Sequence, residues 1–256
     1  MFDASLWAAN PGQLMLAQED IHVWRANLEC EPATLHSLET ILAPEEVARA
    51  GRFRLTRDRN SFIATRGILR NLLGKYVGCA PSEIVLKYGE RGKPSLSDVQ
   101  HQTVQFNVSR SHGLALFAFA AEKSVGIDVE LVRHNFPATE IAARYFSPQE
   151  VEELKALPPS HFYEGFFLCW TRKEAYVKAR GEGMLISLDS FRVSIAPGQP
   201  ELLESIDSAR WSLHSITPDP RYVGALVAER VGVKDARICH WDWNSTETAR
   251  EIQRQP

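Results

Sequence analysis

The sequence is poor in cysteine and contains no long apolar run. Its four cysteines lie far apart and form no C-x-x-C pair: Cys30, Cys79, Cys169 and Cys239. This spacing argues against a zinc ribbon or a disulfide framework and favours reduced thiols in a protein core. No segment offers about 18 uncharged apolar residues in a row, and the first residues lack a basic stretch followed by an apolar one. We therefore expect a cytoplasmic protein that does not bind a membrane.

The chain also lacks the positive charge that is typical of nucleic-acid-binding proteins. It has 29 Lys and Arg against 32 Asp and Glu, a net charge of −3 over 256 residues. A hydrophobic content of 44% is ordinary for a globular protein. Any anion-binding site must therefore come from local clustering of basic residues.

One such cluster lies between residues 49 and 75, where Asp58 is the only acid. The basic residues there are Arg49, Arg52, Arg54, Arg57, Arg59, Arg66, Arg70 and Lys75. Apolar residues recur through the same stretch, so we expect most of these side chains to lie along a packed helix. The excess still predicts a phosphate or an acidic protein as a partner for some of them. Nucleic acid is the weaker candidate, because aromatic residues are not interleaved.

Residues 125–130 read V-G-I-D-V-E, in which apolar and other residues alternate. A period of two residues predicts a strand that is buried on one face. Asp128 and Glu130 then share the other face, about 7 Å apart along the strand.

Residues 170–178 read W-T-R-K-E-A-Y-V-K. Trp170, Glu174 and Lys178 recur at four-residue steps, which places them along one side of a helix and brings the Glu and the Lys within reach of each other. We expect this helix to run from about residue 161 to 180 and to end at Gly181.

Carboxylates from the strand and the helix would together form an oxygen-rich pocket. Such a pocket suits Mg²⁺, which binds a few carboxylates and takes further ligands from water and substrate phosphates. Neither stretch contains His or Cys, so zinc is not expected. Taken separately, each stretch also fits a plainer interpretation: two solvated acids on an edge strand, and ion pairs on a helix surface.

The two stretches together, G-I-D-V-E followed by W-T-R-K-E-A-Y-V-K, resemble the signature of the 4′-phosphopantetheinyl transferases of the large, monomeric Sfp type. The resemblance implies an α+β fold, a pseudo-dimer of two similar α/β halves with the active site at their junction. We divide the chain accordingly. Residues 1–122 are expected to contact the nucleotide of coenzyme A, and residues 123–256 to carry the acids that bind Mg²⁺.

A weak internal repeat agrees with two halves. Residues 43–47, A-P-E-E-V, are similar to residues 147–151, S-P-Q-E-V, and the same offset pairs Arg70 with Glu174. Two similar halves would share a cleft, which is a natural binding site. We expect residues 1–20 to be a lead-in of little function and the tail from Trp241 onward to be peripheral.

Two further segments resemble elements of the same family. Residues 91–94, R-G-K-P, are similar to its G-K-P element, and residues 106–111, F-N-V-S-R-S, to its F-N-x-S-H-S segment, with Arg110 in place of the usual histidine. Arginine keeps a positive charge and a fork of donors, so phosphate binding should survive this exchange, although acid-base use of the histidine would not. The resemblance implies that coenzyme A is held by Arg49, Arg91, Lys93, Ser109, Arg110 and Lys178.

The activity implied is transfer of the 4′-phosphopantetheine arm of coenzyme A to a serine of an apo acyl or peptidyl carrier protein, with release of 3′,5′-ADP. Mg²⁺ would be held by Asp128, Glu130 and Glu174. The serine hydroxyl needs a base, and Glu174 or Glu150 could take its proton directly or through water. The carrier could serve fatty acid, polyketide or non-ribosomal peptide synthesis.

Two other functions remain open on the sequence. A non-catalytic module could recognise acidic carrier or nucleotide surfaces through the basic residues between 49 and 75, but it would not need three carboxylates. Another Mg²⁺-dependent phosphotransferase would share the carboxylates but not the R-G-K-P and N-V-S-R segments. All of these features are present, which favours the transferase.

Overall fold

The computed structural model describes residues 7–9, 14–89, 92–97, 103–196, 200, 202–230 and 236–243. Its helices are α1 (Pro32–Thr40), α2 (Pro44–Ala50), α3 (Thr56–Val77), α4 (Ala138–Tyr145), α5 (Pro148–Ala156) and α6 (Phe162–Arg180). Its strands are β1 (Ala8–Ala9), β2 (Asp20–Asn27), β3 (Leu86–Tyr88), β4 (Pro94–Leu96), β5 (Val104–Ser111), β6 (Leu114–Ala121), β7 (Val125–Leu131), β8 (Arg192–Val193), β9 (Leu202–Glu204), β10 (Trp211–Ile216), β11 (Tyr222–Glu229) and β12 (Arg237–Asp242).

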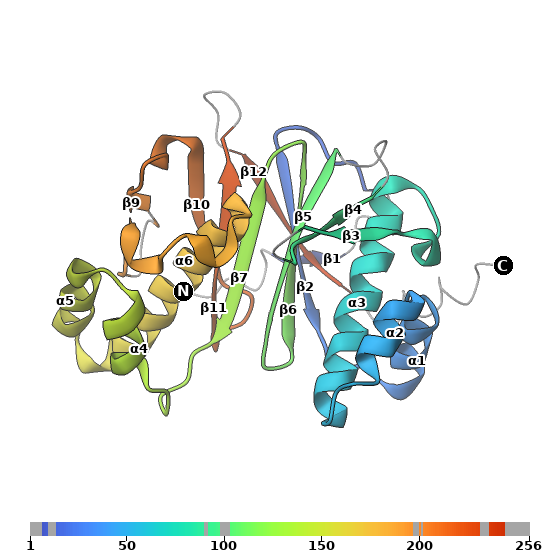
Figure 1. The fold of residues 1–256 in the computed structure, drawn as a ribbon, viewed down its shortest axis with the longest axis horizontal. Coiled ribbons are helices and arrows are strands. Elements are labelled where there is room, and N and C mark those ends of the chain that lie inside the picture. Colours follow the sequence, from blue (N-terminus) through green and yellow to red (C-terminus); the bar gives the residue numbers. More distant parts are fainter. Residues whose placement is uncertain are drawn as a thin grey trace.

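The elements repeat in the same order in two halves. Each half begins with a strand, continues through two short helices, one long helix and a small hairpin, and ends with two strands. The first strand of each half pairs with the last, which pairs in turn with the last but one: β2-β6-β5 in one sheet and β7-β11-β10 in the other. Figure 1 shows the long helices α3 and α6 on opposite outer sides of the strands. The predicted α+β pseudo-dimer is confirmed.

Both halves also contain the same buried ion pair. Glu46, in the first turn of α2, pairs with Arg70 of α3 at 2.6 Å, and Glu150, in the first turn of α5, pairs with Lys173 of α6 at 2.8 Å. Each cation also donates to carbonyls of the segment that follows its helix. The pairing of Arg70 with Glu174 predicted from the sequence is therefore wrong by one residue, because Arg70 corresponds to Lys173.

Three groups of buried apolar residues form the core. One lies between α3 and the first sheet, and a second between α6 and the second sheet. In the third, Val125, Ile127 and Val129 of β7 pack with residues of β2, β6 and β11, so that the two sheets share apolar contacts. The predicted alternation of β7 is confirmed: its apolar residues face this shared core, and Asp128 and Glu130 face away from it.

Strands from the N-terminal and C-terminal parts of the chain pair in the first sheet. β12 lies between β1 and β2 and runs parallel to both, so the first sheet contains a strand from the C-terminal end of the chain. Trp7 and Trp243 are both buried, with exposed fractions of 8% and 7%. The expectations of a lead-in of little function and a peripheral tail are thus wrong for these residues, which complete the sheet and its core. Among the described residues, no helix is both long and apolar enough to cross a lipid bilayer.

Helix α6 lies against β7 at Gly126. A Cβ at this position would lie 2.2 Å from the carbonyl oxygen of Ala175 and 2.3 Å from the amide nitrogen of Ala179. Both atoms belong to the helix backbone, so they cannot rotate away. A residue without a side chain is therefore what allows the helix to approach the strand that carries Asp128 and Glu130.

We expect Gly126→Ala to destabilise the protein by about 3 kcal/mol or more, because α6 must move away from β7 to admit the methyl group. Urea unfolding followed by circular dichroism measures the change. Gly51→Ala is the matched control: its Cβ would meet backbone atoms at 3.7 and 3.8 Å, an ordinary contact, so its stability should change little. Equal midpoints for Gly126→Ala and wild type would contradict this account of the contact.

Candidate active site at the junction of the two halves

The halves meet where β5, the edge strand of the first sheet, lies beside β7, the edge strand of the second. Alternate residues of β5 bond to β7 through their side chains. Asn107 Oδ1 accepts from the amide of Ile127 at 2.9 Å, and Ser109 Oγ donates to Asp128 Oδ1 at 2.7 Å. Ser111 Oγ donates to Glu130 Oε2 at 2.7 Å. The F-N-V-S-R-S segment therefore fixes the two acids of β7.

Asp128 is the most connected of the three predicted metal ligands. Its Oδ1 accepts from Ser109 and from the ammonium of Lys178, which lies 2.6 Å away. The same ammonium lies 3.2 Å from Ser109 Oγ and 3.3 Å from the carbonyl oxygen of Ile127. Only 4% of Asp128 is exposed. The carboxylate thus joins β5, β7 and α6.

Glu130 and Glu174 lie within electrostatic reach of Asp128 and of each other. Burial raises the pKa of Glu174, the negative charges of Asp128 and Glu130 raise it further, and Lys178 lowers it. Burial likewise raises the pKa of Glu130, against the hydrogen bond from Ser111, and Asp128 adds to the increase. Burial and nearby negative charges disfavour the charged form of a carboxyl group and so raise its pKa. Carboxyl groups with a raised pKa at a cleft are often functional.

The three carboxylates do not form a ready-made metal cage. In the part of the chain that the structure describes, no three His, Cys, Asp or Glu side chains stand close enough to hold a metal ion together. Asp128 does have a buried oxygen to spare, because its Oδ2 has no hydrogen-bond partner. Such an oxygen has lost its hydrogen bonds to water on folding, and no group of the protein replaces them.

A cavity of about 660 Å³ opens beside these acids, with Glu174, Lys178, Trp170, Lys93 and Asn107 in its wall. The presence of Trp170, Glu174 and Lys178 on one wall confirms that they share a face of α6, and Gly181 ends this helix with a φ of +71°. Residues of both halves line the cavity, as expected for a cleft at the junction of a duplicated fold.

Lys93 binds the helix end rather than open solvent. Its ammonium donates to the carbonyl oxygens of Lys178 at 2.7 Å and of Val125 at 3.4 Å. Burial lowers the pKa of Lys93 to about 8. The residue therefore joins the small hairpin of the first half to α6 and β7. Arg91, also predicted to hold coenzyme A, lies outside the described residues.

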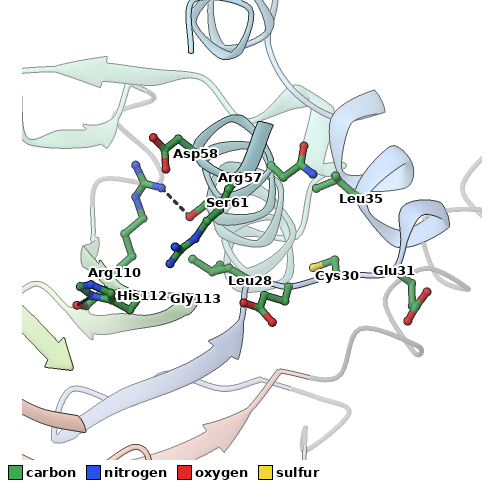
Figure 2. A pocket seen from close by; sticks show the side chains of 13 residues that line it. Leu28, Cys30, Glu31, Leu35, Arg57, Asp58, Ser61, Arg110, His112 and Gly113 are labelled. Carbon is green, nitrogen blue, oxygen red and sulfur yellow. Dashed lines mark hydrogen bonds between the residues drawn. The ribbon is translucent and has the colours of Figure 1, made fainter. Parts of the chain in front are cut away.

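Arg110 lies on the other side of β5, next to helix α3. Figure 2 shows its guanidinium reaching Ser61, to which it donates at 2.7 Å, in a cavity of about 550 Å³ that Arg57, Asp58 and His112 also line. Burial lowers the pKa of Arg110, and the neighbouring charges of Arg66 and Arg49 lower it further against that of Asp58. Several positive charges therefore gather here, which favours an anionic ligand.

Arg49 contributes to this group from helix α2. It is exposed, and its guanidinium lies over the ring of Phe62, 5.4 Å from the centroid. Arg66 lies over the same ring at 5.7 Å. Two predicted nucleotide contacts, Arg49 and Arg110, thus belong to one basic region, whereas Lys93, Ser109 and Lys178 belong to the junction.

The structure does not support Glu150 as a base. The side chain has no exposed surface, and each of its oxygens has a structural partner: Oε1 accepts from the amide of Val193, and Oε2 from the amide of Ser147 and from Lys173. A carboxylate in this position caps α5 and neutralises Lys173. Both of its oxygens are therefore occupied by groups of the protein.

Sequence reasoning did not single out Ser111, Asn107 or Arg66. The signal for the first two was their spacing, because Asn107, Ser109 and Ser111 alternate along β5 as Asp128 and Glu130 do along β7. Arg66 carries no such signal, since it is one of eight basic residues in its stretch.

We expect Glu150→Gln to cost about 3 kcal/mol of stability, because it leaves the ammonium of Lys173 buried without a counter-charge. Turnover of the folded enzyme should stay within about tenfold of wild type, since the carboxylate touches no reacting group. Glu152→Gln is the matched control: Glu152 pairs with Lys155 on the surface, so its loss should cost under about 1 kcal/mol. Unchanged stability with lost turnover would restore Glu150 as a catalytic candidate.

Comparison with known proteins finds one family along most of the chain. The family model described as the 4′-phosphopantetheinyl transferase superfamily matches residues 124–227, and the model of the N-terminal part of 4′-phosphopantetheinyl transferases matches residues 27–124. The 4′-phosphopantetheinyl transferase HetI of Nostoc sp. is 37% identical over 88% of this chain and 94% of its own length.

Two relatives of lower identity are also described as phosphopantetheinyl transferases. The 4′-phosphopantetheinyl transferase Sfp of Bacillus subtilis is 27% identical over 74% of this chain and 83% of its own. The human L-aminoadipate-semialdehyde dehydrogenase-phosphopantetheinyl transferase is 28% identical over 84% of this chain and 74% of its own. The paired acids of β7, the W-T-R-K-E-A-Y-V-K helix and the two duplicated halves therefore have a single explanation: this chain belongs to the 4′-phosphopantetheinyl transferase superfamily.

Proposed function

We propose that this protein transfers the 4′-phosphopantetheine arm of coenzyme A to a serine of an apo carrier protein, using the acids at the junction of its halves. The observation that carries the proposal is that Asp128, Glu130 and Glu174, from two elements, interact electrostatically with one another and with Lys178. Glu174 and Lys178 line a cavity of about 660 Å³. Family membership supports the reaction, and this geometry supports the assignment of residues.

The same residues fit Mg²⁺. All three candidate ligands are carboxylates, which hard divalent cations prefer, and Asp128 Oδ2 is buried without a partner. Burial raises the pKa of Glu174, and the negative charges of Asp128 and Glu130 add to this increase; a cation would relieve that repulsion. When bound, Mg²⁺ would neutralise the charge that builds on the phosphates during transfer.

The chain's own groups account for the remaining steps. The serine oxygen forms a bond to the phosphorus that carries pantetheine, and the bond from that phosphorus to 3′,5′-ADP breaks. Glu174 takes the serine proton, because its carboxylate lies in the cavity wall beside Lys178, where the serine and the phosphate would meet. Lys178, held by Asp128 and Ser109, presents a positive charge to the phosphates.

We assign the nucleotide end of coenzyme A to the basic region of the first half. Arg110, Arg49 and Arg66 bring three guanidinium groups within electrostatic reach of each other. Such a group favours a phosphate, which accepts paired hydrogen bonds from arginine. Lys93 supports this end by fixing the hairpin against α6. We further propose that the protein acts in the cytoplasm as a monomer, without nucleic acid or membrane.

The direct test is to incubate the protein with coenzyme A, Mg²⁺ and a panel of apo carrier proteins, and to weigh the carriers by mass spectrometry. We expect one or more carriers to gain the phosphopantetheine arm on serine, and the gain to disappear with a chelator. Carriers from fatty acid, polyketide and non-ribosomal peptide synthesis, compared side by side, identify the pathway. No mass increase on any carrier would reject the proposal.

We expect Asp128→Ala and Glu174→Gln each to lower turnover by about a thousandfold or more, since each removes a carboxylate from a sparse set of metal ligands. Calorimetric titration with Mg²⁺ gives a second measurement, in which both variants should bind more weakly than wild type. Glu164→Gln, which removes an acid on the same helix outside the junction cavity, is the control. Turnover within tenfold of wild type for either junction variant would reject this assignment.

We expect Arg110→Ala to raise the KM for coenzyme A by about tenfold or more and to change kcat less, because Arg110 holds the nucleotide and not the reacting atoms. Steady-state kinetics at varied coenzyme A concentration measures both constants. Arg110→Lys, which keeps the charge but loses the fork of donors, should fall between the two. A KM equal to that of wild type would contradict this role.

A further inference from the structure

A second large cavity is lined by residues of the second half. Its volume is about 790 Å³, and residues of α6, β10, β11 and the segment after β7 line it. It shares no lining residue with the junction cavity of about 660 Å³. The size is that of a typical small-molecule site.

Arg172 lines this cavity from α6. Only 1% of the residue is exposed. Its Nη1 donates to the carbonyl oxygen of Ser194 at 2.6 Å, to Ser194 Oγ at 3.1 Å and to the carbonyl oxygen of Ala196 at 3.3 Å. Its Nη2 donates to Ser215 Oγ at 3.3 Å, and Ser215 also lines the cavity.

The positive charge of Arg172 has no counter-charge in the described part of the chain. No ion pair joins it to a carboxylate there, in contrast to the other two fully buried cations, Arg70 and Lys173, which pair with Glu46 and Glu150. Burial lowers the pKa of Arg172 to about 10, and only Cys169 opposes this shift. A buried charge held by neutral groups alone is costly.

One donor of the guanidinium is also unused. Nε is buried and has no hydrogen-bond partner among the described residues. Nε and Nη2 form the edge of a guanidinium that binds both oxygens of a carboxylate or phosphate. On this edge Nε has no partner and Nη2 has one long bond to a hydroxyl. This edge therefore lacks an acceptor, on a residue that lines the cavity.

The rest of the wall suits an anion with an apolar body. His134, Thr217 and Arg221 also line it, as do the apolar side chains of Val132 and Ile216. Two groups reduce the positive charge: Glu164 lies in the wall, and Arg221 pairs with Asp219 at 3.2 Å. Arg172 is thus the one buried and unneutralised cation in this wall.

We propose that this cavity is a second anion site, separate from the transfer site, which binds a small molecule through a phosphate or carboxylate group on Arg172. The oxyanion supplies the counter-charge that the fold does not provide and the acceptor that the Nε and Nη2 edge lacks. The site lies on the helix that carries Glu174 and Lys178, so its ligand stabilises α6.

The test is a thermal unfolding series of the full chain, titrated with inorganic phosphate and, separately, with acetate at matched ionic strength. For the anion class that the site takes, we expect the midpoint of wild type to rise with concentration in a saturable way. Arg172→Met, which replaces the cation by an apolar chain of similar length, should weaken the apparent affinity by about tenfold or more. Thr217→Trp, which keeps Arg172 and fills the cavity from an exposed position, should do the same.

Two controls separate this site from other effects of anions. Arg210→Met removes a surface arginine outside the cavity, one that pairs with Glu229, and should retain the full response. Arg110→Ala removes phosphate binding at the nucleotide region, so the response that remains in this variant belongs to the cavity of Arg172. If Arg172→Met does not fold, Thr217→Trp gives the result alone. An equal response in all variants, a loss confined to Arg110→Ala, or no saturable response to either anion would overturn the proposal.

Discussion

The junction depends on one carboxylate oxygen. Asp128 Oδ1 accepts from Ser109 of the first half and from Lys178 of the second, so a single atom joins β5, β7 and α6. The side chains of Asp128, Ser109 and Lys178 bond to one another there, so removing Asp128 leaves the ammonium of Lys178 without its counter-charge and Ser109 Oγ without this acceptor. The same atom positions the lysine that is proposed to meet the phosphates. A single substitution at this site therefore changes both the contacts of the junction and the proposed reaction. For this reason Mg²⁺ binding is measured in addition to turnover.

The helix reaches this carboxylate because Gly126 has no side chain. On one face of β7, Gly126 lies against the backbone of α6, and Asp128 and Glu130 follow at two-residue steps. On the other face, Val125, Ile127 and Val129 pack into the core that the two sheets share. One strand thus anchors the second sheet to the first and presents two acids to the helix. The negative charge is concentrated where packing is closest, and the raised pKa of Glu130 and Glu174 follows from that confinement.

The hydrophobic and polar pattern of the sequence predicted those parts of the site whose position depends only on the geometry of one strand or one helix. The period of two in residues 125–130 and the period of four in Trp170, Glu174 and Lys178 report backbone geometry directly, and both predictions are confirmed. The position of Glu150 could not be predicted in this way, because its burial depends on Lys173 of another helix. The position of β12 depends on pairing with β2, more than two hundred residues earlier in the chain. Arg172 reads as one more charge on a helix until the loop and strand around it are known.

The long helices α3 and α6 occupy equivalent places in the duplicated fold, but only α6 carries an acid that lines the junction cavity. Arg70 and Lys173 stand at the same distance before the left-handed glycines that end α3 and α6, Gly78 and Gly181, and each pairs with the glutamate that caps the preceding short helix. The residue after the cation is Asn71 in the first half and Glu174 in the second. Asn71 is buried, whereas Glu174 lines the junction cavity. The buried ion pair fixes how each long helix is rotated about its axis. The residue after the cation therefore occupies an equivalent position in both halves. Whether that position can serve the proposed reaction depends on whether it holds Asn71 or Glu174.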